Sequence, residues 1–264
     1  MLRVGLIGLG AVTLPLAQQW VAGGFPKDVE FVGALTRTPR EDPPLPIVHD
    51  ARELLALGAQ YVVEGAGHSA VRSHVGPLLE AGVEVAVTSI GALIDDDLRA
   101  HLLAAAEAGG GRLILPSAGI GALDMLGGMA EGGLDSVTVT VRKSPEAWLG
   151  TPGEDLVDLM ALTEPATLFD GSVRDGAPVY PGNVNISAAA AFAGAGLEKT
   201  RLLIIADPTV TNHVIDLEAV GAAGRLTFRE DMVPSPDNPK TGVIVAMALA
   251  KTIRQRASRM TVGA

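Results

Sequence analysis

The hydrophobic residues in the first half of the chain form short runs that are separated by glycine-containing turns and by longer amphipathic stretches. Apolar runs at 4–7, 29–35, 59–64, 83–87 and 112–115 have the length of buried strands. Helical patterns fill 70–81 and 95–108, and another begins at Ala11. This alternation predicts a parallel, doubly wound α/β sheet, and we assign it to a domain at 1–116.

The pattern changes beyond residue 116. From Ser136 to Arg142, valines alternate with polar residues, which is typical of an antiparallel strand with one covered face. Further strands are expected at 202–206, 213–219 and 225–229, with an acidic helix at 154–162 and an alanine-rich helix at 186–195. These elements predict a second, α+β domain at 117–236.

A last helix is expected in the segment 237–264. Asp237, Asn238 and Pro239 offer an N-cap and a first-turn proline, so the helix is predicted from Lys240 to about Arg256. We expect it to pack back on the first domain through a set of apolar residues: Val243, Ile244, Met247, Ala250 and Ile253.

Composition narrows the classes of protein. The 264 residues carry a net charge of −10 and only 3% aromatic residues, which argues against nucleic-acid binding. The absence of cysteine excludes disulfides, thiolate nucleophiles and cysteine-ligated zinc, and fits a reducing cytoplasm. Because no apolar run is long enough for a membrane span and no carboxylates have metal-ligand spacing, we expect a soluble, unprocessed cytoplasmic protein without a membrane partner or a metal.

The first strand leads through Gly8 and Gly10 into a helix, with Ala11 and Val12 at the turn. Glycines let a backbone approach a pyrophosphate closely, and free N–H groups at a helix start favour its negative charge. The turn therefore predicts a dinucleotide site, although Thr13 stands where the full pattern has a third small residue and predicts a wider helix–strand contact. An ordinary strand-to-helix turn is the alternative.

The residues that follow the second strand bear on the choice of cofactor. A carboxylate there binds the ribose 2′-OH of NAD, whereas an arginine accommodates the 2′-phosphate of NADP. This chain has Thr36 and Arg37, so NADP is tolerated, unless Arg37 is only a solvated surface residue. The loop after the third strand adds Gly65, Ala66 and His68 as candidate cofactor contacts, because ligands bind at the carboxyl ends of such strands.

His213 is the strongest candidate for proton transfer, because it follows a turn-rich segment between two strands. Its strand parity also allows a packed core histidine. Four further residues are weaker candidates for binding substrate carboxylates, with solvated charge as the alternative: Arg142, Lys143, Lys240 and Thr241. Asn185 precedes the alanine-rich helix and is expected either to cap it or to contact a cofactor.

Nine short segments occur in an order that resembles the L-aspartate dehydrogenase family and cover nearly the whole chain. They are Gly8-Leu9-Gly10, Val62-Val63-Glu64-Gly65-Ala66, Ser89-Ile90-Gly91-Ala92-Leu93, 116–124, Thr140-Val141-Arg142-Lys143, Asn183-Val184-Asn185, Ile205-Ala206-Asp207-Pro208, Asn212-His213 and Asn238-Pro239-Lys240-Thr241.

The resemblance implies an N-terminal Rossmann domain, a second domain that carries the substrate site and mediates dimerisation, and NAD(P)-dependent conversion of L-aspartate to iminoaspartate. Hydrolysis of the imine gives oxaloacetate and ammonia, and the reverse reaction is a reductive amination. The resemblance also implies that His213 is the active-site histidine and that Gly119 and Asn185 contact NAD. Two other functions stay open: a dehydrogenase of similar plan with another amino or hydroxy acid as substrate, and a catalytically silent NAD(P) sensor.

Overall fold

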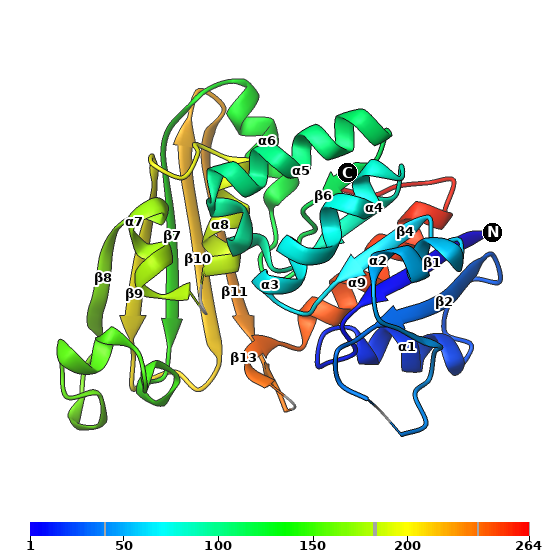
Figure 1. Cartoon of the computed structure of the whole chain (residues 1–264). Helices are drawn as coiled ribbons and strands as arrows, with labels where there is room; N and C mark the ends of the chain where they lie inside the picture. Colours follow the sequence, from blue (N-terminus) through cyan, green and yellow to red (C-terminus); the bar gives the residue numbers. More distant parts are fainter. Residues whose placement is uncertain (40, 182–183, 237, 264) are drawn as a thin grey trace. The chain divides into compact units, whose positions relative to one another are not determined.

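The two halves of the sequence form two separate sheets in a computed structural model of the chain, which describes residues 1–39, 41–181, 184–236 and 238–263 (Figure 1). Contacts divide the chain into one unit of Met1–Ala118 with Val245–Ala264 and a second unit of Gly119–Ile244. The boundaries expected from the sequence stood at 116 and 236. Each unit is described by itself.

The first unit contains a parallel sheet with the strand order β3-β2-β1-β4-β5-β6. Its strands are β1 (Leu2–Ile7), β2 (Val29–Leu35), β3 (Ile47–Val48), β4 (Tyr61–Glu64), β5 (Glu84–Val87) and β6 (Arg112–Ile114). This is the order of the Rossmann fold, so the predicted doubly wound sheet is confirmed. The strand order reverses between β1 and β4, and in such folds ligands bind at the carboxyl ends of these strands.

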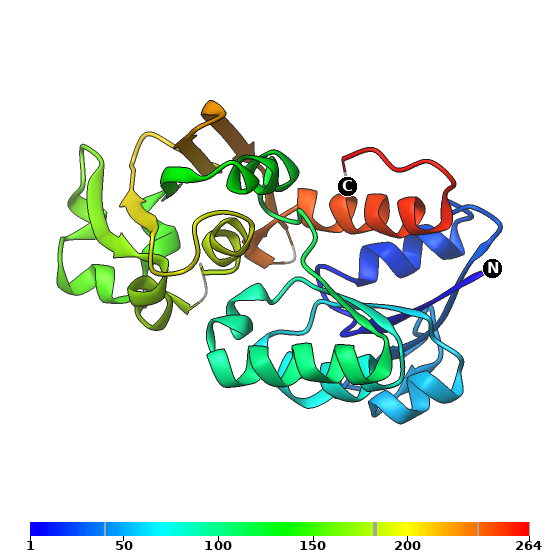
Figure 2. The same ribbon diagram turned by 90° about the horizontal axis from the view of Figure 1, so that it is seen from above.

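Helices cover both faces of this sheet (Figure 2). One face carries α1 (Leu14–Val21) and α9 (Ile244–Ala257), and the other carries α2 (Ala51–Ala56), α3 (His68–Ala70), a π-helical segment (Val71–Val75), α4 (Gly76–Glu80) and α5 (Asp96–Gly109). The expected helix start at Ala11 is wrong, because Gly10 O accepts the N–H groups of Thr13 and Leu14 in a turn that precedes α1.

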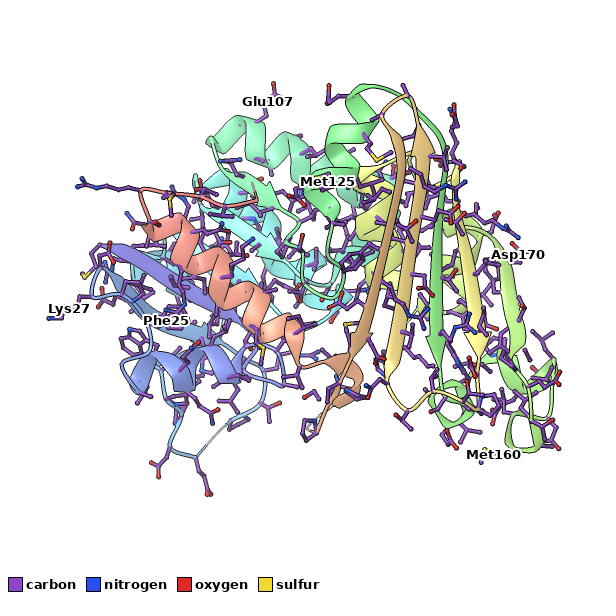
Figure 3. The ribbon with its side chains drawn as sticks, turned by 180° about the vertical axis from the view of Figure 1, so that it is seen from behind. Phe25, Lys27, Glu107, Met125, Met160 and Asp170 are labelled. Atoms are coloured by element: carbon purple, nitrogen blue, oxygen red, sulfur yellow. The ribbon has the colours of Figure 1, made fainter. Side chains whose placement is uncertain are left out.

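Helix α9 packs into the core of the first unit. Val245, Leu249 and Ile253 are buried together with Val4 and Leu6 of β1, whereas Ile244 and Met247 are exposed, so the predicted phase of the helix is partly wrong. The Arg254 guanidinium lies 4.5 Å from the centre of the Phe25 ring, which stands beside α9 in Figure 3. Apolar burial and this cation–π contact together hold the helix on the sheet.

The second unit contains a five-stranded sheet with the order β11-β10-β7-β9-β8. Its strands are β7 (Leu134–Lys143), β8 (Ala166–Ser172), β9 (Thr200–Ala206), β10 (His213–Gly221) and β11 (Gly224–Met232). The pair β7·β9 is parallel, and the other neighbouring pairs are antiparallel. The α+β character expected for this part of the chain is confirmed.

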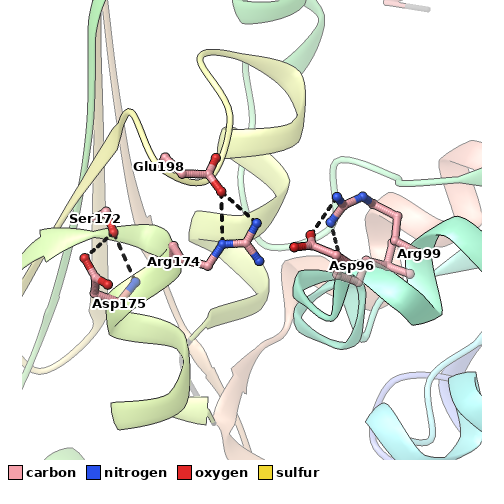
Figure 4. A network of polar contacts seen from close by, with 7 residues as sticks. Asp96, Arg99, Ser172, Arg174, Asp175 and Glu198 are labelled. Carbon is pink, nitrogen blue, oxygen red and sulfur yellow. Dashed lines mark hydrogen bonds and ion pairs between the residues drawn. The ribbon is translucent and has the colours of Figure 1, made fainter.

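Three helices cover one face of this sheet: α6 (Leu123–Glu131), α7 (Val173–Val179) and α8 (Val184–Ala193). The valines of β7 point toward the helices and are buried. Helix α7 begins at a capped turn, because Ser172 Oγ accepts the Asp175 N–H at 3.1 Å and donates to the Asp175 carboxylate at 2.6 Å (Figure 4). Arg174 of the same helix pairs with Glu198 at 2.7 Å, which fixes α7 to the turn before β9.

One predicted helix is wrong, and another begins later than expected. Residues 154–162 form short 3-10 turns, Pro152–Asp155 and Leu159–Ala161, because an extended backbone at Asp158 interrupts them; Met160 is left exposed at this end of the unit (Figure 3). The chain around Lys240 forms a hairpin of β12 (Pro234–Ser235) and β13 (Asn238–Gly242) in place of a first helical turn. Asp237, the expected N-cap, lies outside the described residues.

No helix within the described ranges combines the length and the apolar character that crossing a membrane requires.

Candidate active site

The turn between β1 and α1 is held by a buried hydroxyl. Gly8 has φ +89°, a backbone conformation that favours glycine, and a Cβ there would lie 2.9 Å from the Cβ of Ala66. Thr13 is fully buried, and its Oγ1 donates to Gly8 O at 3.0 Å. A Cβ on Gly65 would meet the Thr13 methyl group at 2.8 Å. Gly65 thus takes the part of the third small residue of the pattern. Because it lies opposite Thr13, the turn after β1 and the turn after β4 pack closely, and the predicted wider contact is not seen.

Gly10 and Gly67 leave room beside this turn. A Cβ on either residue would meet no heavy atom within 4 Å, in contrast to the crowded Gly8 and Gly65. Both open glycines lie at the carboxyl ends of strands that flank the reversal of strand order. Space beside a glycine turn at this edge fits the pyrophosphate of a dinucleotide.

Gly10→Ala is therefore expected to weaken binding of the cofactor by at least about tenfold while it leaves the melting temperature nearly unchanged, since the added methyl group occupies ligand space and not protein space. Titration of the reduced cofactor, followed by its fluorescence, measures the affinity. Gly128→Ala is the matched control, because Gly128 in α6 also has no heavy atom within 4 Å of a built Cβ. Equal affinities of the two variants would remove Gly10 from the site.

The other candidates in the first unit follow the carboxyl ends of strands at the same edge. Arg37 is exposed in the bend that follows β2, as expected for a group that reads the 2′ position of a ribose. His68 begins α3 directly after Gly67, so it belongs to a helix start and not to a free loop. Arg40 lies outside the described residues.

The second unit brings His213 and Lys143 together. Val214 of β10 pairs with Arg142 of β7, so His213 and Lys143 follow at the ends of these two neighbouring strands, both on the face that the helices cover. Both side chains are buried, with exposed fractions of 6% and 5%. The Lys143 ammonium lies 5.6 Å from the centre of the Trp148 ring, and Trp148 packs edge-on against Tyr180.

This environment keeps the imidazole neutral. Burial, and then the charge of Lys143, lower the pKa of His213 from 6.5 to about 4. His213 is thus neutral near pH 7 and can accept a proton. Lys143 provides a cation at the same end of the sheet, whose attraction for a carboxylate is strengthened by its removal from water.

Arg142 lies on the opposite face of β7 from Lys143. Its guanidinium pairs with the buried Asp207 carboxylate at 2.9 Å, and that carboxylate also accepts the N–H and the hydroxyl of Thr209. These contacts lower the pKa of Asp207, although burial opposes them. The structure therefore does not bring Arg142 to His213, and the pair Arg142–Asp207 fixes the turn that precedes β10.

The remaining candidates are dispersed in the second unit. Asn185 lies in the first turn of α8, which begins at Val184, so it is not the N-cap residue; Asn183 lies outside the described residues. Gly119 lies in the bend between β6 and α6. Thr241 accepts a hydrogen bond from the Asn238 amide at 3.2 Å in β13, and the side chain of Lys240 is not among those described.

Trp148 was not anticipated from the sequence. It is one of only two tryptophans in the sequence, and it follows the end of the strand that carries Lys143. Its rarity and its position next to a candidate residue are the signals that could have identified it.

A pocket lined by Met1, Gln60, Glu84 and Arg256 lies in the first unit, at the amino ends of the parallel strands. Because ligands of this fold bind at the carboxyl ends, this pocket is not the cofactor site.

Comparison with known proteins agrees with this geometry. Residues 124–256 match the family model described as aspartate dehydrogenase, C-terminal, and residues 4–116 match the model described as homoserine dehydrogenase, NAD binding domain. The L-aspartate dehydrogenase of Ruegeria pomeroyi is 43% identical over 258 residues, which are 96% of this chain and 92% of that protein. This chain belongs to the L-aspartate dehydrogenase family. The family member from Cupriavidus necator is 36% identical over 99% of this chain and 100% of its own.

Solved structures share the fold of the present chain. The crystal structure of aspartate dehydrogenase from Thermotoga maritima has a TM-score of 0.80 at 21% identity and covers 99% of both chains. A hyperthermophilic archaeal homoserine dehydrogenase in complex with NADPH has a TM-score of 0.61 at 11% identity and covers 98% of both chains. With its NAD-binding domain, the chain is an NAD(P)-dependent dehydrogenase of this family.

Proposed function

We propose that the protein oxidises L-aspartate to iminoaspartate with NAD or NADP and catalyses the reverse reductive amination. The observation that carries this proposal is the pair His213–Lys143, a neutral base and a buried cation at the ends of two neighbouring strands. An amino acid with an additional carboxylate suits such a pair, because one group accepts a proton from the amine and the other binds the carboxylate. The names of the relatives support the choice of aspartate.

In the proposed reaction, His213 takes the proton that the amino group of aspartate loses. Lys143 binds a carboxylate of the substrate and so orients Cα. The bound cofactor supplies a nicotinamide ring that accepts the hydride from Cα or returns it. Residues Gly8 to Val12, with Gly65, Ala66 and Arg37, hold the cofactor, and Gly119 and Asn185 are additional contacts in the proposal. Water then converts the imine to oxaloacetate and ammonia. Orientation of the reacting groups supplies much of the rate.

An oxidation assay over a panel of substrates tests the choice of aspartate. Purified protein is mixed with L-aspartate, L-glutamate, L-alanine, L-homoserine or L-malate, and formation of reduced cofactor is followed by absorbance. The proposal predicts that kcat/KM for L-aspartate exceeds every other value. A larger value for another substrate would assign a different dehydrogenase, and tight cofactor binding without any turnover would assign a sensor.

The same assay, run with both cofactors, tests cofactor choice. Arg37 is exposed in the bend after β2, where a positive charge can meet a 2′-phosphate. We therefore include turnover with NADP in the proposal, and activity with NAD alone would contradict it.

A homodimer in the cytoplasm completes the proposal. The face of the second sheet that lies opposite α6, α7 and α8 presents partly exposed Thr138, Thr140, Leu203 and Ile205, a mixed surface of the kind that a second copy can cover. Light scattering is expected to give about twice the chain mass of 27.1 kDa, and a monomer at micromolar concentration would exclude the dimer.

A further inference from the structure

A buried carboxylate lies directly behind the glycine turn. Glu64 is the last residue of β4 and pairs with Ile7, the residue before Gly8. Its exposed fraction is 0%. It therefore stands at the carboxyl ends of β1 and β4, between which the strand order reverses and beside which the cofactor binds.

Four hydrogen bonds are donated to this carboxylate. Oε1 accepts from Ala66 N at 2.7 Å, from Gly67 N at 2.9 Å and from the Ser89 hydroxyl at 2.9 Å, and Oε2 accepts from Ser89 N at 3.1 Å. The Ser89 hydroxyl also accepts from Gly67 N at 3.1 Å, so it uses its proton for Glu64. All four donors are neutral.

These contacts are those of an ionised carboxylate. Burial raises the pKa of Glu64 above its usual value, and the hydrogen bonds from Ala66, Ser89 and Gly67 oppose this rise in part. Three backbone N–H groups and one hydroxyl donate to the two oxygens, three of them to Oε1 and one to Oε2, and such donors stabilise the charged form of a carboxyl group. Because all four groups donate and none accepts, the geometry favours the ionised form, which carries its negative charge inside the protein.

We propose that Glu64 is a fixed buried anion that favours the oxidised, positively charged nicotinamide over the reduced, neutral one. This inference rests on cofactor binding by the first unit and not on the identity of the substrate. In the reductive direction, a C–H bond of the reduced ring breaks, its hydride forms the new C–H bond at Cα of the imine, and the imine nitrogen gains a proton. Because the ring becomes positive in this direction, Glu64 favours donation of the hydride and hence amination.

The size of the effect follows from electrostatics. Two unit charges about 10 Å apart, at an effective dielectric constant of about 20, change an equilibrium constant by roughly ten- to twentyfold. Glu64→Gln removes the charge and keeps nearly the same volume. It is therefore expected to lower the affinity for the oxidised cofactor about tenfold relative to the affinity for the reduced one.

The experiment measures dissociation constants of both redox forms, without substrate, for whichever pair the protein binds more tightly: NAD+ with NADH or NADP+ with NADPH. Calorimetry gives the value for the oxidised form, and fluorescence gives the value for the reduced form. Ser89→Ala is the matched control, because it removes one hydrogen bond to the same carboxylate and keeps the charge. It is expected to change both affinities alike and to leave their ratio unchanged.

Each outcome decides the inference. An unchanged ratio in E64Q, or a shift in S89A as large as in E64Q, would overturn it. If E64Q does not fold, Glu64→Asp retains the charge and is expected to keep the ratio within about threefold of the wild type; a tenfold change in E64D would equally overturn it. A wild-type protein that binds neither form contradicts the inference together with the proposed function, whereas a failure to oxidise aspartate with normal binding contradicts the proposed function alone.

Discussion

Replacing His213 with asparagine is expected to lower kcat for L-aspartate by about 10²- to 10⁴-fold, the usual contribution of a positioned proton acceptor. The affinity for the reduced cofactor is expected to stay unchanged, because His213 lies in the second unit and the glycine turn lies in the first. Steady-state kinetics and a fluorescence titration measure the two quantities. The asparagine places a polar amide at the buried position and leaves a smaller gap than alanine.

His101→Ala is the matched control for this variant. His101 is exposed on α5, outside every loop of the proposed site, and its replacement is expected to leave kcat within about twofold of the wild type. If His213→Asn retains full activity, His213 has no part in proton transfer. Equal losses in both histidine variants would also contradict its role.

Replacing Lys143 with methionine is expected to raise the KM for L-aspartate by about 10- to 100-fold with a smaller change in kcat, since a hydrogen bond to a charged group contributes about 1.5–3 kcal/mol. Methionine keeps an unbranched side chain against the Trp148 ring, so the packing against this ring is retained.

The same variant is expected to change the pH profile of kcat/KM. Because Lys143 helps to lower the pKa of His213 to about 4, its removal shifts that pKa upward toward 6.5.

The sign of the pH effect is fixed by the role of the imidazole. In the wild type, kcat/KM is expected to fall as the pH drops through about 4, where the free enzyme's His213 becomes protonated and can no longer accept a proton. In Lys143→Met, this acid limb is expected at higher pH. Kinetics from pH 4 to 8 test both effects, and a raised KM with an unmoved acid limb would separate Lys143 from His213. Arg229→Met on the exposed edge of β11 is the control and is expected to change neither quantity.

Most strands of the two sheets followed from local pattern, with β3 and β8 as the exceptions. Val29–Leu35 is a nearly continuous apolar run and forms β2 with those bounds, and the alternation from Ser136 to Arg142 lies within β7. Such patterns reflect burial on two faces or on one face, so they survive the tertiary context. The mixed composition of β8, and the glycines in α6 and α7, gave no comparable signal; these elements are stabilised by the sheet on which they pack.

Local signals failed where two structures compete for the same residues. Asn238 and Pro239 suit a helix start, yet the hairpin β12·β13 uses this segment, with Ser235 paired to Asn238, and α9 begins only at Ile244. For the site, the sequence identified Gly8, Lys143 and His213 as candidates. It did not reveal that Arg142 pairs with Asp207, or that the Ser89 hydroxyl and N–H both donate to Glu64. Those contacts join residues 25 or more positions apart, which local patterns do not report.

Reductive amination is a direct test of the proposed aspartate dehydrogenase activity. The purified protein is mixed with oxaloacetate, ammonia and either NADH or NADPH, and oxidation of the cofactor and formation of L-aspartate are measured together. We expect cofactor oxidation that requires ammonia and yields one L-aspartate per cofactor oxidised. Cofactor oxidation that proceeds equally without ammonia and yields malate, or no turnover by a protein that binds the cofactor, would contradict it.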